Sequence, residues 1–133
     1  MPPTDLDVVR RGFEAMNAGD LEGLIDVLAD DVVATVPSEY ANADVYRGRD
    51  GFRLMAEQWL EPWSRFRAEP LDFIEEGGAL IVPVHQSGTG RESGIEVEMD
   101  LAYLMRVRDG RLAEWRLCAD IGEARELARG GLP

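Results

Sequence analysis

The sequence has 133 residues, 45% of them hydrophobic, which is enough for one domain with a substantial core. Twenty-six acidic residues against fourteen basic ones give a formal net charge of −12, so we expect neither nucleic acid nor an anionic membrane as a partner. Every basic residue is an arginine. Because there is no lysine, Schiff-base and pyridoxal phosphate chemistry are excluded.

Reactive and metal-binding side chains are scarce. The chain has one histidine, His85, and one cysteine, Cys118, so we expect no structural zinc site and no intrachain disulfide, and Cys118 should pack as a small hydrophobe. No glycine-rich phosphate-binding fingerprint lies between a strand and a helix. We therefore expect no cofactor and no metal. The N-terminal residues lack the pattern of a secretory signal and no apolar run is long enough for a membrane span, which predicts a cytoplasmic protein.

Two helices are predicted at the start of the chain. Apolar residues repeat at helical spacing over residues 5–17, and the preceding segment 4–7 (TDLD) has the form of a capping box. Gly19 suits the left-handed residue that ends this helix, and Asp20 suits the N-cap of a second helix that runs to about residue 28.

A third helix follows two short β segments. It should begin with Asp50 as its N-cap and end at Pro62. Its apolar stripe includes Trp59 and Trp63, which either line a ligand cavity or belong to the plain core. The segments before it are an apolar strand at 32–36, a polar loop at 37–44 and a short strand at 45–47.

The second half of the chain reads as an antiparallel meander. Residues 65–75 suit an outer strand, because Pro70 is tolerated only near an edge or a bulge. Asp109-Gly110 is a two-residue turn signal between two β segments. The other predicted elements are a strand at 79–88, a hairpin spanning 95–120 and a short C-terminal helix at 121–129.

The turn at Asp109-Gly110 predicts which side chains share a face. It sets Val107 opposite Leu112, and steps of two then pair Tyr103 with Arg116 and Met99 with Asp120. We expect helices to cover the face that carries Asp120. A second subunit should cover the other face, which makes the protein a homodimer. The centre of that interface is predicted at Trp115, Leu117, Leu104 and Ala102. A one-residue bulge would reverse the two faces.

The order of elements is helix, helix, strand, helix and then a meander, which predicts an α+β fold. Three segments carry a family resemblance: VVRRGFEAMNAGDLEGLIDVLADDV at 8–32, YRGRDGFRLM at 46–55 and RVRDGRLAEWRLCADIGEARELARGGL at 106–132. In these segments the chain resembles the SnoaL-like family of the nuclear transport factor 2-like superfamily. The resemblance implies a single domain over residues 1–133, in which a curved, mostly antiparallel sheet is wrapped on one side by three helices and joined by a short C-terminal helix. The resulting cone encloses an apolar pocket.

Ketosteroid isomerases resemble the chain through residues 8–32, but their catalytic positions differ here. Their oxyanion tyrosine falls on Gly12 and their general-base aspartate falls near Val36. Neither side chain can donate a hydrogen bond or accept a proton. The comparison therefore excludes steroid isomerisation by that machinery.

In two other families, a catalytic aspartate occupies the position that corresponds to Asp120. Limonene-type epoxide hydrolases carry an aspartate in the pattern WRxxxD, which reads WRLCAD at residues 115–120. Their other aspartate falls on His85 and the arginine between them falls on Pro83. SnoaL-like polyketide cyclases use an aspartate at the end of the last strand as acid and base, and that position is again Asp120.

Asp120 and His85 are predicted on strands that flank the same neighbour. Adjacent strands lie ~4.8 Å apart, so the two groups can share a water or a small substrate. Desolvation raises the pKa of a carboxylate in an apolar pocket, and histidine titrates near neutral pH. The pair can then abstract a proton next to a carbonyl and return it to the alkoxide. Two alternatives stay open, in which Asp120 caps the helix that follows and His85 is a hydrogen-bonded structural residue.

The sequence predicts a protein with a pocket for a small apolar molecule, and two functions for it. The first is a cofactor-independent cyclase or isomerase that acts on an apolar carbonyl compound through Asp120 and His85. The second is a non-catalytic ligand-binding or assembly module of the same fold. The residues predicted to line the pocket are Tyr40, Trp59, Trp63, Met99, Tyr103 and Arg116, unless Arg116 only pairs with Glu114 or Asp120.

Overall fold

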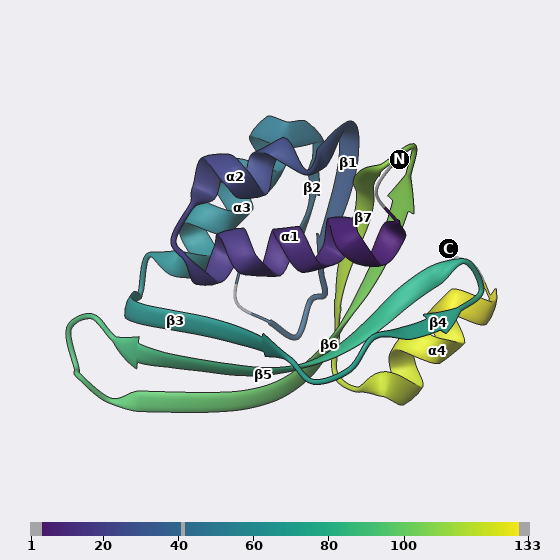
Figure 1. Cartoon of the computed structure of the whole chain (residues 1–133). Coiled ribbons are helices and arrows are strands. Elements are labelled where there is room, and N and C mark those ends of the chain that lie inside the picture. The colour runs from purple at the N-terminus through teal and green to yellow at the C-terminus, as the bar shows by residue number, and fades with distance from the viewer. Residues whose placement is uncertain (1–3, 41, 131–133) are drawn as a thin grey trace.

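The computed structural model of the protein describes residues 4–40 and 42–130, and this part of the chain has the predicted α+β architecture (Figure 1). The helices are α1 (Asp5–Asn17), α2 (Leu21–Asp26), α3 (Gly48–Leu60) and α4 (Ile121–Gly130). The strands are β1 (Leu28–Val36), β2 (Asp44–Arg47), β3 (Trp63–Pro70), β4 (Ile74–Glu76), β5 (Ala79–Gly90), β6 (Glu96–Arg108) and β7 (Arg111–Cys118).

All the strands belong to one curved sheet in the order β2-β1-β7-β6-β5-β3, with β4 paired to β5 outside this path. β1 and β7 run parallel, and the other neighbouring strands are antiparallel, so the predicted meander is confirmed. Pro70 lies on the edge strand β3, where its missing N–H costs no ladder hydrogen bond. β3 and the paired ends of β5 (84–90) and β6 (96–101) extend away from the rest of the sheet, and we call this part the arm (Figure 1).

Local capping signals place the first two helices. The Thr4 hydroxyl accepts a hydrogen bond from the Asp7 N–H at 3.1 Å, and the Asp7 carboxylate accepts one from the Thr4 N–H at 3.2 Å. Gly19 has a φ of +72°, and the Asp20 carboxylate accepts from the Gly23 N–H at 2.9 Å. These predicted caps are confirmed. Among residues 4–40 and 42–130, no helix has the length and apolar character that a bilayer crossing requires.

α3 begins earlier than the sequence predicts, so the assignment of Asp50 as its N-cap is wrong. Arg47 holds the N-cap position and makes no capping hydrogen bond with its side chain. Gly48 has a φ of +76°, a conformation that glycine adopts without strain, and it turns the chain sharply from β2 into the helix. Asp50 lies in the first turn, where the positive end of the helix dipole stabilises a carboxylate.

The β6–β7 hairpin has the predicted turn. Asp109 and Gly110 both have positive φ, +53° and +76°, as a type I′ turn requires. Val107 pairs with Leu112 across it, which is the predicted first pair.

Beyond that first pair, the predicted register is wrong because β7 contains a bulge. Arg106 pairs with Glu114, so Ala113 is an extra residue on β7. A one-residue insertion reverses the face of every later side chain. Tyr103 therefore pairs with Leu117 instead of Arg116, and the predicted pairing of Met99 with Asp120 is replaced by Met99 with Gln86 on β5.

The bulge has a clear energetic reason. It lets Leu112, Trp115 and Leu117 all point to the face that α1, α2 and α3 cover, where they are 2%, 6% and 0% exposed. A regular strand would have buried Glu114 and Arg116 beside Leu112 instead. Burying an unpaired charge costs far more than a local break in the ladder, so the bulged register is favoured.

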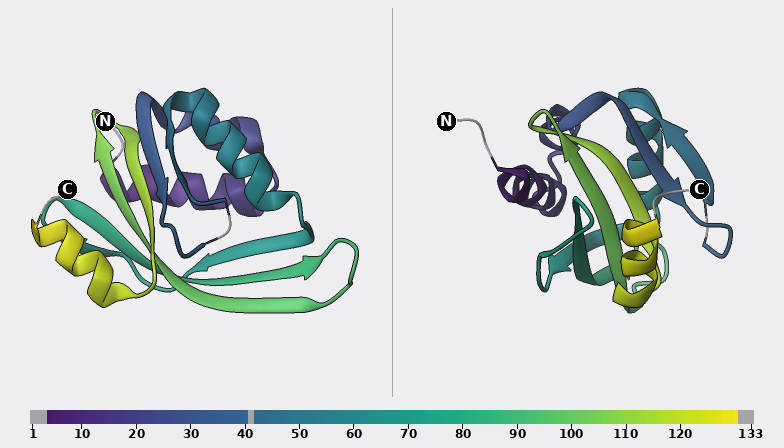
Figure 2. Two further views of the ribbon diagram at one scale, coloured as in Figure 1. Left: turned by 180° about the vertical axis from the view of Figure 1, so that it is seen from behind. Right: turned by 90° about the vertical axis from the view of Figure 1, so that its right-hand side faces the viewer.

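Helices cover part of each face of the sheet, and Figure 2 shows this from two directions. We call the face against α1, α2 and α3 the inner face and the opposite one the outer face. Large apolar side chains such as Val82, Tyr103 and Trp115 fill the inner core. On the outer face, α4 packs over Ile81 and Cys118, and both are 0% exposed. Burial raises the pKa of the Cys118 thiol to about 12, so this cysteine is an unreactive core residue, as predicted.

The predicted centre of the homodimer is wrong for the same reasons. Trp115 and Leu117 belong to the inner core. Leu104 and Ala102 do lie on the outer face, but both are 0% exposed because α4 covers them. The apolar patch that motivated the prediction is thus already buried within one chain.

The free edge of the sheet at β3 is closed by a side chain. The Asn17 amide nitrogen, at the end of α1, donates to the Ala68 carbonyl at 2.9 Å. Its amide oxygen accepts from the Ala68 N–H at 2.8 Å. The two bonds satisfy the backbone N–H and C=O of Ala68, which would otherwise bond to a neighbouring strand. They also hold α1 against the arm.

Candidate functional site

A cavity of about 50 Å³ lies between the inner face and helices α1, α2 and α3. One water needs ~10–15 Å³ of cavity volume, measured as the volume open to the centre of a water-sized sphere. As it stands, the cavity therefore holds a ligand of only a few heavy atoms. The wall consists of aliphatic, methionine and aromatic side chains and one glycine, Gly12. The aromatic members are Phe13, Phe52, Trp59, Tyr103 and Trp115, and the methionines are Met16, Met55 and Met105.

The aromatic rings of the cavity wall pack against one another. Tyr103 stacks on Phe13 with ring centroids 5.7 Å apart and planes 7° from parallel. Trp115 meets Tyr103 edge to face at 5.0 Å, and Trp59 meets Trp115 in the same way at 6.4 Å. Such contacts fix ring orientation, so these rings form a preformed wall. The methionines are the adaptable part, because a thioether chain changes rotamer at little cost.

The polar feature of this region is a buried hydrogen bond between Tyr103 and Gln86. The Tyr103 hydroxyl donates to the Gln86 amide oxygen, and the two residues are 2% and 7% exposed. Burial raises the pKa of Tyr103, so the phenol stays protonated at neutral pH. Tyr103 can therefore donate a hydrogen bond to a ligand but cannot act as a general base there.

Of the residues predicted to line a pocket, two belong to this cavity: Trp59 and Tyr103. Tyr40 is half-buried and packs against the inner core. Trp63 and Met99 lie on the inner side of the arm, outside the cavity wall, and Met99 is 46% exposed. Contact of any of these residues with a ligand stays a prediction.

Arg116 does not belong to the cavity, which corrects its predicted role. The Ala113 bulge turns it to the outer face. Its predicted partner Glu114 instead pairs with Arg106, with 3.0 Å between Nε and Oε1. The Arg116 Nε is buried and has no hydrogen-bond partner among the described residues.

Asp120 does not point into the cavity, so its predicted orientation is also wrong. It is exposed, and its Oδ1 accepts a hydrogen bond from the Glu123 N–H at 2.9 Å. Glu123 returns the interaction, because its Oε2 accepts from the Ala119 N–H at 2.9 Å. These bonds cap the N-terminus of α4, which is the structural alternative that the sequence left open.

His85 also lies on the outer face, bonded to two carboxylates of β6. Its Nδ1 is 2.7 Å from Asp100 Oδ1 and its Nε2 is 3.1 Å from Glu98 Oε1. The hydrogen bonds to Asp100 and then Glu98 raise the pKa of His85, since each carboxylate favours the imidazolium. Asp120 and His85 therefore do not form an acid–base pair inside the cavity.

The sequence analysis did not identify several residues that line the cavity, nor Gln86, which bonds to the cavity residue Tyr103. Gln86 follows Val82 and Val84 at steps of two and so shares their inner face, a signal that was present in the strand pattern. Trp115 was assigned to the wrong face by the missed bulge. Phe13 and Met55 were recognised only as parts of apolar helix stripes, because periodicity cannot separate a cavity wall from a filled core.

Comparison with known proteins bears on the family and the fold of the chain. Residues 9–115 match the family model described as SnoaL-like domain. An uncharacterized protein from Mycobacterium tuberculosis (strain H37Rv) is 50% identical over 46 residues, and an identically matching one occurs in Mycobacterium bovis. The chain spans about a third, 35%, of the length of these relatives.

Solved structures share the fold over nearly the whole chain. An NTF2-like protein of unknown function from Burkholderia pseudomallei has a TM-score of 0.76 and 24% identity, covering 93% of this chain and 94% of the other. A putative polyketide cyclase from Sinorhizobium meliloti has a TM-score of 0.69 and 23% identity, covering 84% and 93%. A hypothetical protein with a ketosteroid isomerase-like fold from Catenulispora acidiphila, in complex with trimethylamine, has a TM-score of 0.76 and 15% identity, covering 98% and 96%. At these identities the likeness establishes the nuclear transport factor 2-like fold alone.

Proposed function

Because the chain belongs to the SnoaL-like domain family, we propose that its cone-shaped interior binds a small, uncharged, apolar molecule and does not convert it. The observation that carries the proposal is the wall of the 50 Å³ cavity, which consists of aromatic, methionine and aliphatic side chains. Such a wall favours apolar atoms and leaves a charge without compensation.

The non-catalytic half of the proposal rests on the positions of the titratable groups. Asp120 is engaged in capping α4 and His85 is bonded to Asp100 and Glu98, both away from the cavity. The Tyr103 hydroxyl remains as a donor for a ligand oxygen, which would have to replace the Gln86 amide oxygen. General acid–base catalysis needs a group that exchanges a proton near neutral pH, and a phenol with a raised pKa does not.

Benzene is larger than the cavity admits as it stands, so the methionine side chains of the wall must change rotamer to let it in. Benzene and benzoate are suitable probes because they differ by one charged group. We expect benzene to shift the indole N–H signals of Trp59 and Trp115 in NMR spectra, since both rings line the cavity. Benzoate should bind at least about 100-fold more weakly, because burying an unpaired carboxylate costs several kcal/mol. Equal binding of the two probes would contradict an apolar site.

Two neighbouring residues of α3 give a matched pair of variants. Met55 lines the cavity and is 5% exposed, whereas Leu54 is 50% exposed and is not part of the wall. Met55→Ala should enlarge the site, admit naphthalene and cost about 2–5 kcal/mol of unfolding free energy. Leu54→Ala should leave the affinity for both hydrocarbons unchanged. If the wild-type protein converts a carbonyl compound and the Tyr103→Phe variant does not, the site is catalytic and the proposal is wrong.

A further inference from the structure

The two long edges of the arm differ in what lies beside them. At β3, Asn17 occupies the backbone groups of Ala68, whereas β6 forms the opposite rim of the arm (Figure 1). β7 pairs with β6 only from Ala102 onward. Residues 96–101 therefore pair with β5 on one side and, in the described part of the chain, with no strand on the other. We call this stretch the β6 edge, and its six residues span about 20 Å, the length of an ordinary strand.

The ladder shows which backbone groups of the β6 edge face outward. The Gly90 N–H donates to the Ile95 carbonyl at 2.9 Å. In an antiparallel ladder the residues that bond to one neighbour recur at every second position, so the odd-numbered residues of the edge bond to β5. The even-numbered residues direct their N–H and C=O groups away from β5, and no other backbone group bonds to them among residues 4–40 and 42–130. These residues are Glu96, Glu98 and Asp100.

The inner side of the β6 edge is apolar. Val97 and Met99 share this side with the core residue Leu101, because side chains at steps of two point to one face. Val97 is 40% exposed, Met99 is 46% exposed, and Ile95 just before the strand is 63% exposed. They are three of the six large hydrophobic side chains that are exposed in the described part of the chain. Single exposed apolar residues are ordinary, but such a concentration within five positions marks a contact surface.

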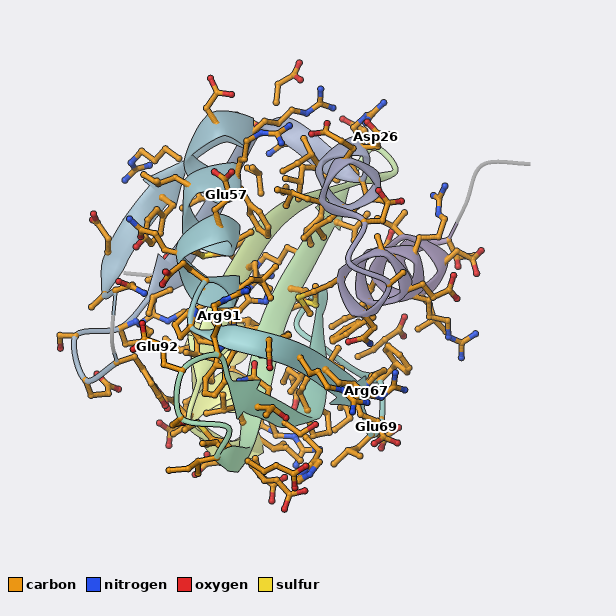
Figure 3. All side chains as sticks on the ribbon, turned by 90° about the vertical axis from the view of Figure 1, so that its left-hand side faces the viewer. Asp26, Glu57, Arg67, Glu69, Arg91 and Glu92 are labelled. Carbon is orange, nitrogen blue, oxygen red and sulfur yellow. The ribbon has the colours of Figure 1, made fainter. Side chains whose placement is uncertain are left out.

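The outer side of the same edge is acidic. Glu96, Glu98 and Asp100 are all exposed there. His85 on β5 bonds to the last two, and Glu96 forms no ion pair with any described residue. Figure 3 views the arm from its tip and shows Arg67 on the β3 side, which is two strands away from this edge. The β6 edge thus keeps a negative charge beside its free backbone groups.

We propose that the β6 edge is a docking site for an extended, basic segment of another protein, which pairs with it as an added antiparallel strand. Antiparallel pairing is slightly more stable per residue than parallel pairing. Directly opposed residues point to the same face, so basic side chains of the segment lie against Glu96, Glu98 and Asp100. Its alternate, apolar side chains lie beside Val97 and Met99. The main-chain bonds provide affinity, and the alternation of side chains provides specificity.

Charge selects this occupant over a second copy of the same edge. Antiparallel pairing of two β6 edges sets Glu98 opposite Glu98, and Glu96 opposite Asp100, and like charges directly opposite each other destabilise a strand pair. Charged side chains on an exposed edge are a common means of preventing such self-association. A basic segment gains from the same charges, and the net charge of −12 favours its approach to the protein.

A short alternating peptide is a suitable probe. Acetyl-Lys-Val-Lys-Val-Lys-amide should bind at low salt with a dissociation constant of about 1 mM or less, measured by NMR titration. The same peptide with glutamate in place of each lysine should bind at least about tenfold more weakly, because like charges are then opposed. Sodium chloride at 0.5 M should weaken binding of the lysine peptide, since salt screens exposed charges.

Backbone methylation tests the strand geometry. Opposed residues exchange both hydrogen bonds at the outward-facing positions of β6, so the lysine N–H groups of the probe should face β6 and the valine N–H groups should face away. N-methylation of the lysines should abolish binding, and N-methylation of the valines should leave the affinity unchanged. On the protein, the bound peptide should slow hydrogen exchange at the Glu98 and Asp100 amides. The Val97 and Met99 amides, which already bond to β5, should not change.

A charge exchange provides an independent test. E96K/E98K should reverse the preference, so that it binds the glutamate peptide more tightly than the lysine peptide. E14K/E57K is the matched control, because it makes the same change of net charge at two exposed positions on α1 and α3. It should keep the preference of the wild-type protein.

The outcomes are distinct once thermal unfolding confirms that both variants are folded. Slowed exchange at the outward amides, together with the reversed preference of E96K/E98K, supports the proposal. Absence of any chemical-shift change at ~5 mM lysine peptide, well above the expected dissociation constant, overturns it. Binding that survives methylation of the lysines shows a contact through side chains alone and overturns it as well. Outward amides that are protected without peptide, increasingly at higher protein concentration, would assign the edge to a second copy and also overturn it.

Discussion

Asp120 illustrates how position, more than residue type, decides what a carboxylate does. A carboxylate at the end of the last strand suits acid–base chemistry when it faces an apolar pocket. Here the same carboxylate faces outward and accepts the Glu123 N–H. Its neighbours are therefore the first residues of α4 rather than a ligand.

Substitution of Asp120 should report on capping. Asp120→Ala removes the acceptor for the Glu123 N–H and should lower the free energy of unfolding by about 1 kcal/mol. Asp120→Asn should cost less than about 0.5 kcal/mol, because asparagine caps as well as aspartate. Urea unfolding measures both, and neither change should alter the affinity for benzene. Equal costs for the two variants, or a loss of binding, would contradict the capping role.

Single residues that act locally could be predicted from the sequence. Thr4, Gly19 and Asp20 determine helix ends through bonds to residues a few positions away, and all three behave as expected. The roles of His85 and Arg116 depend on the face to which their strands turn them. That property is set by partners far along the chain, so local patterns did not reveal it.

At the scale of elements, the bulge at Ala113 determines the character of the interior. It breaks the alternation that the Asp109-Gly110 turn begins, and so brings Trp115 and Leu117 into the inner core. The turn could be predicted because its dipeptide carries the signal. The bulge could not be read in the same way, since alanine fits either a regular or a bulged position.

Deletion of Ala113 should be far more damaging than substitution at the same site. Without the extra residue, regular pairing turns Trp115 and Leu117 outward, and each buried side chain is worth about 1.5–3 kcal/mol. The free energy of unfolding should fall by at least about 3 kcal/mol, measured by denaturant titration with tryptophan fluorescence.

Ala113→Ser is the control for that deletion because it preserves the residue count. It should cost less than about 1 kcal/mol, as expected for a half-buried position away from the core. A deletion variant as stable as Ala113→Ser would mean that the strand finds the same core without the bulge.

At the scale of the whole molecule, one sheet supports two separate cores. The inner core lies under α1, α2 and α3, and the outer core lies under α4. The α+β class and the order of elements followed from periodicity, and the fold followed from the resemblance. The sequence did not reveal that α4 covers the face assigned to a second subunit, because helix periodicity does not say where a helix docks.

Removal of α4 should expose the outer core while leaving the inner one intact. A chain ending at Asp120 uncovers Ile81, Leu104 and Cys118, which form an apolar patch of the kind that drives association. We expect it to keep its near-ultraviolet circular dichroism from the inner aromatic cluster but to form large oligomers in light scattering. A chain ending at Gly130 keeps α4 and should match the full-length protein. A soluble truncated monomer would contradict this account.

The side-chain amide of Asn17 prevents another strand from pairing with the edge of the sheet at Ala68. Each bond it makes to Ala68 occupies a backbone group that another strand would otherwise use. An edge strand with vacant N–H and C=O groups is a template on which further chains can add, one strand at a time, until a fibril results. One side chain at the end of a helix thus blocks strand addition at Ala68, and Pro70, which has no N–H to offer, extends this protection along the same edge.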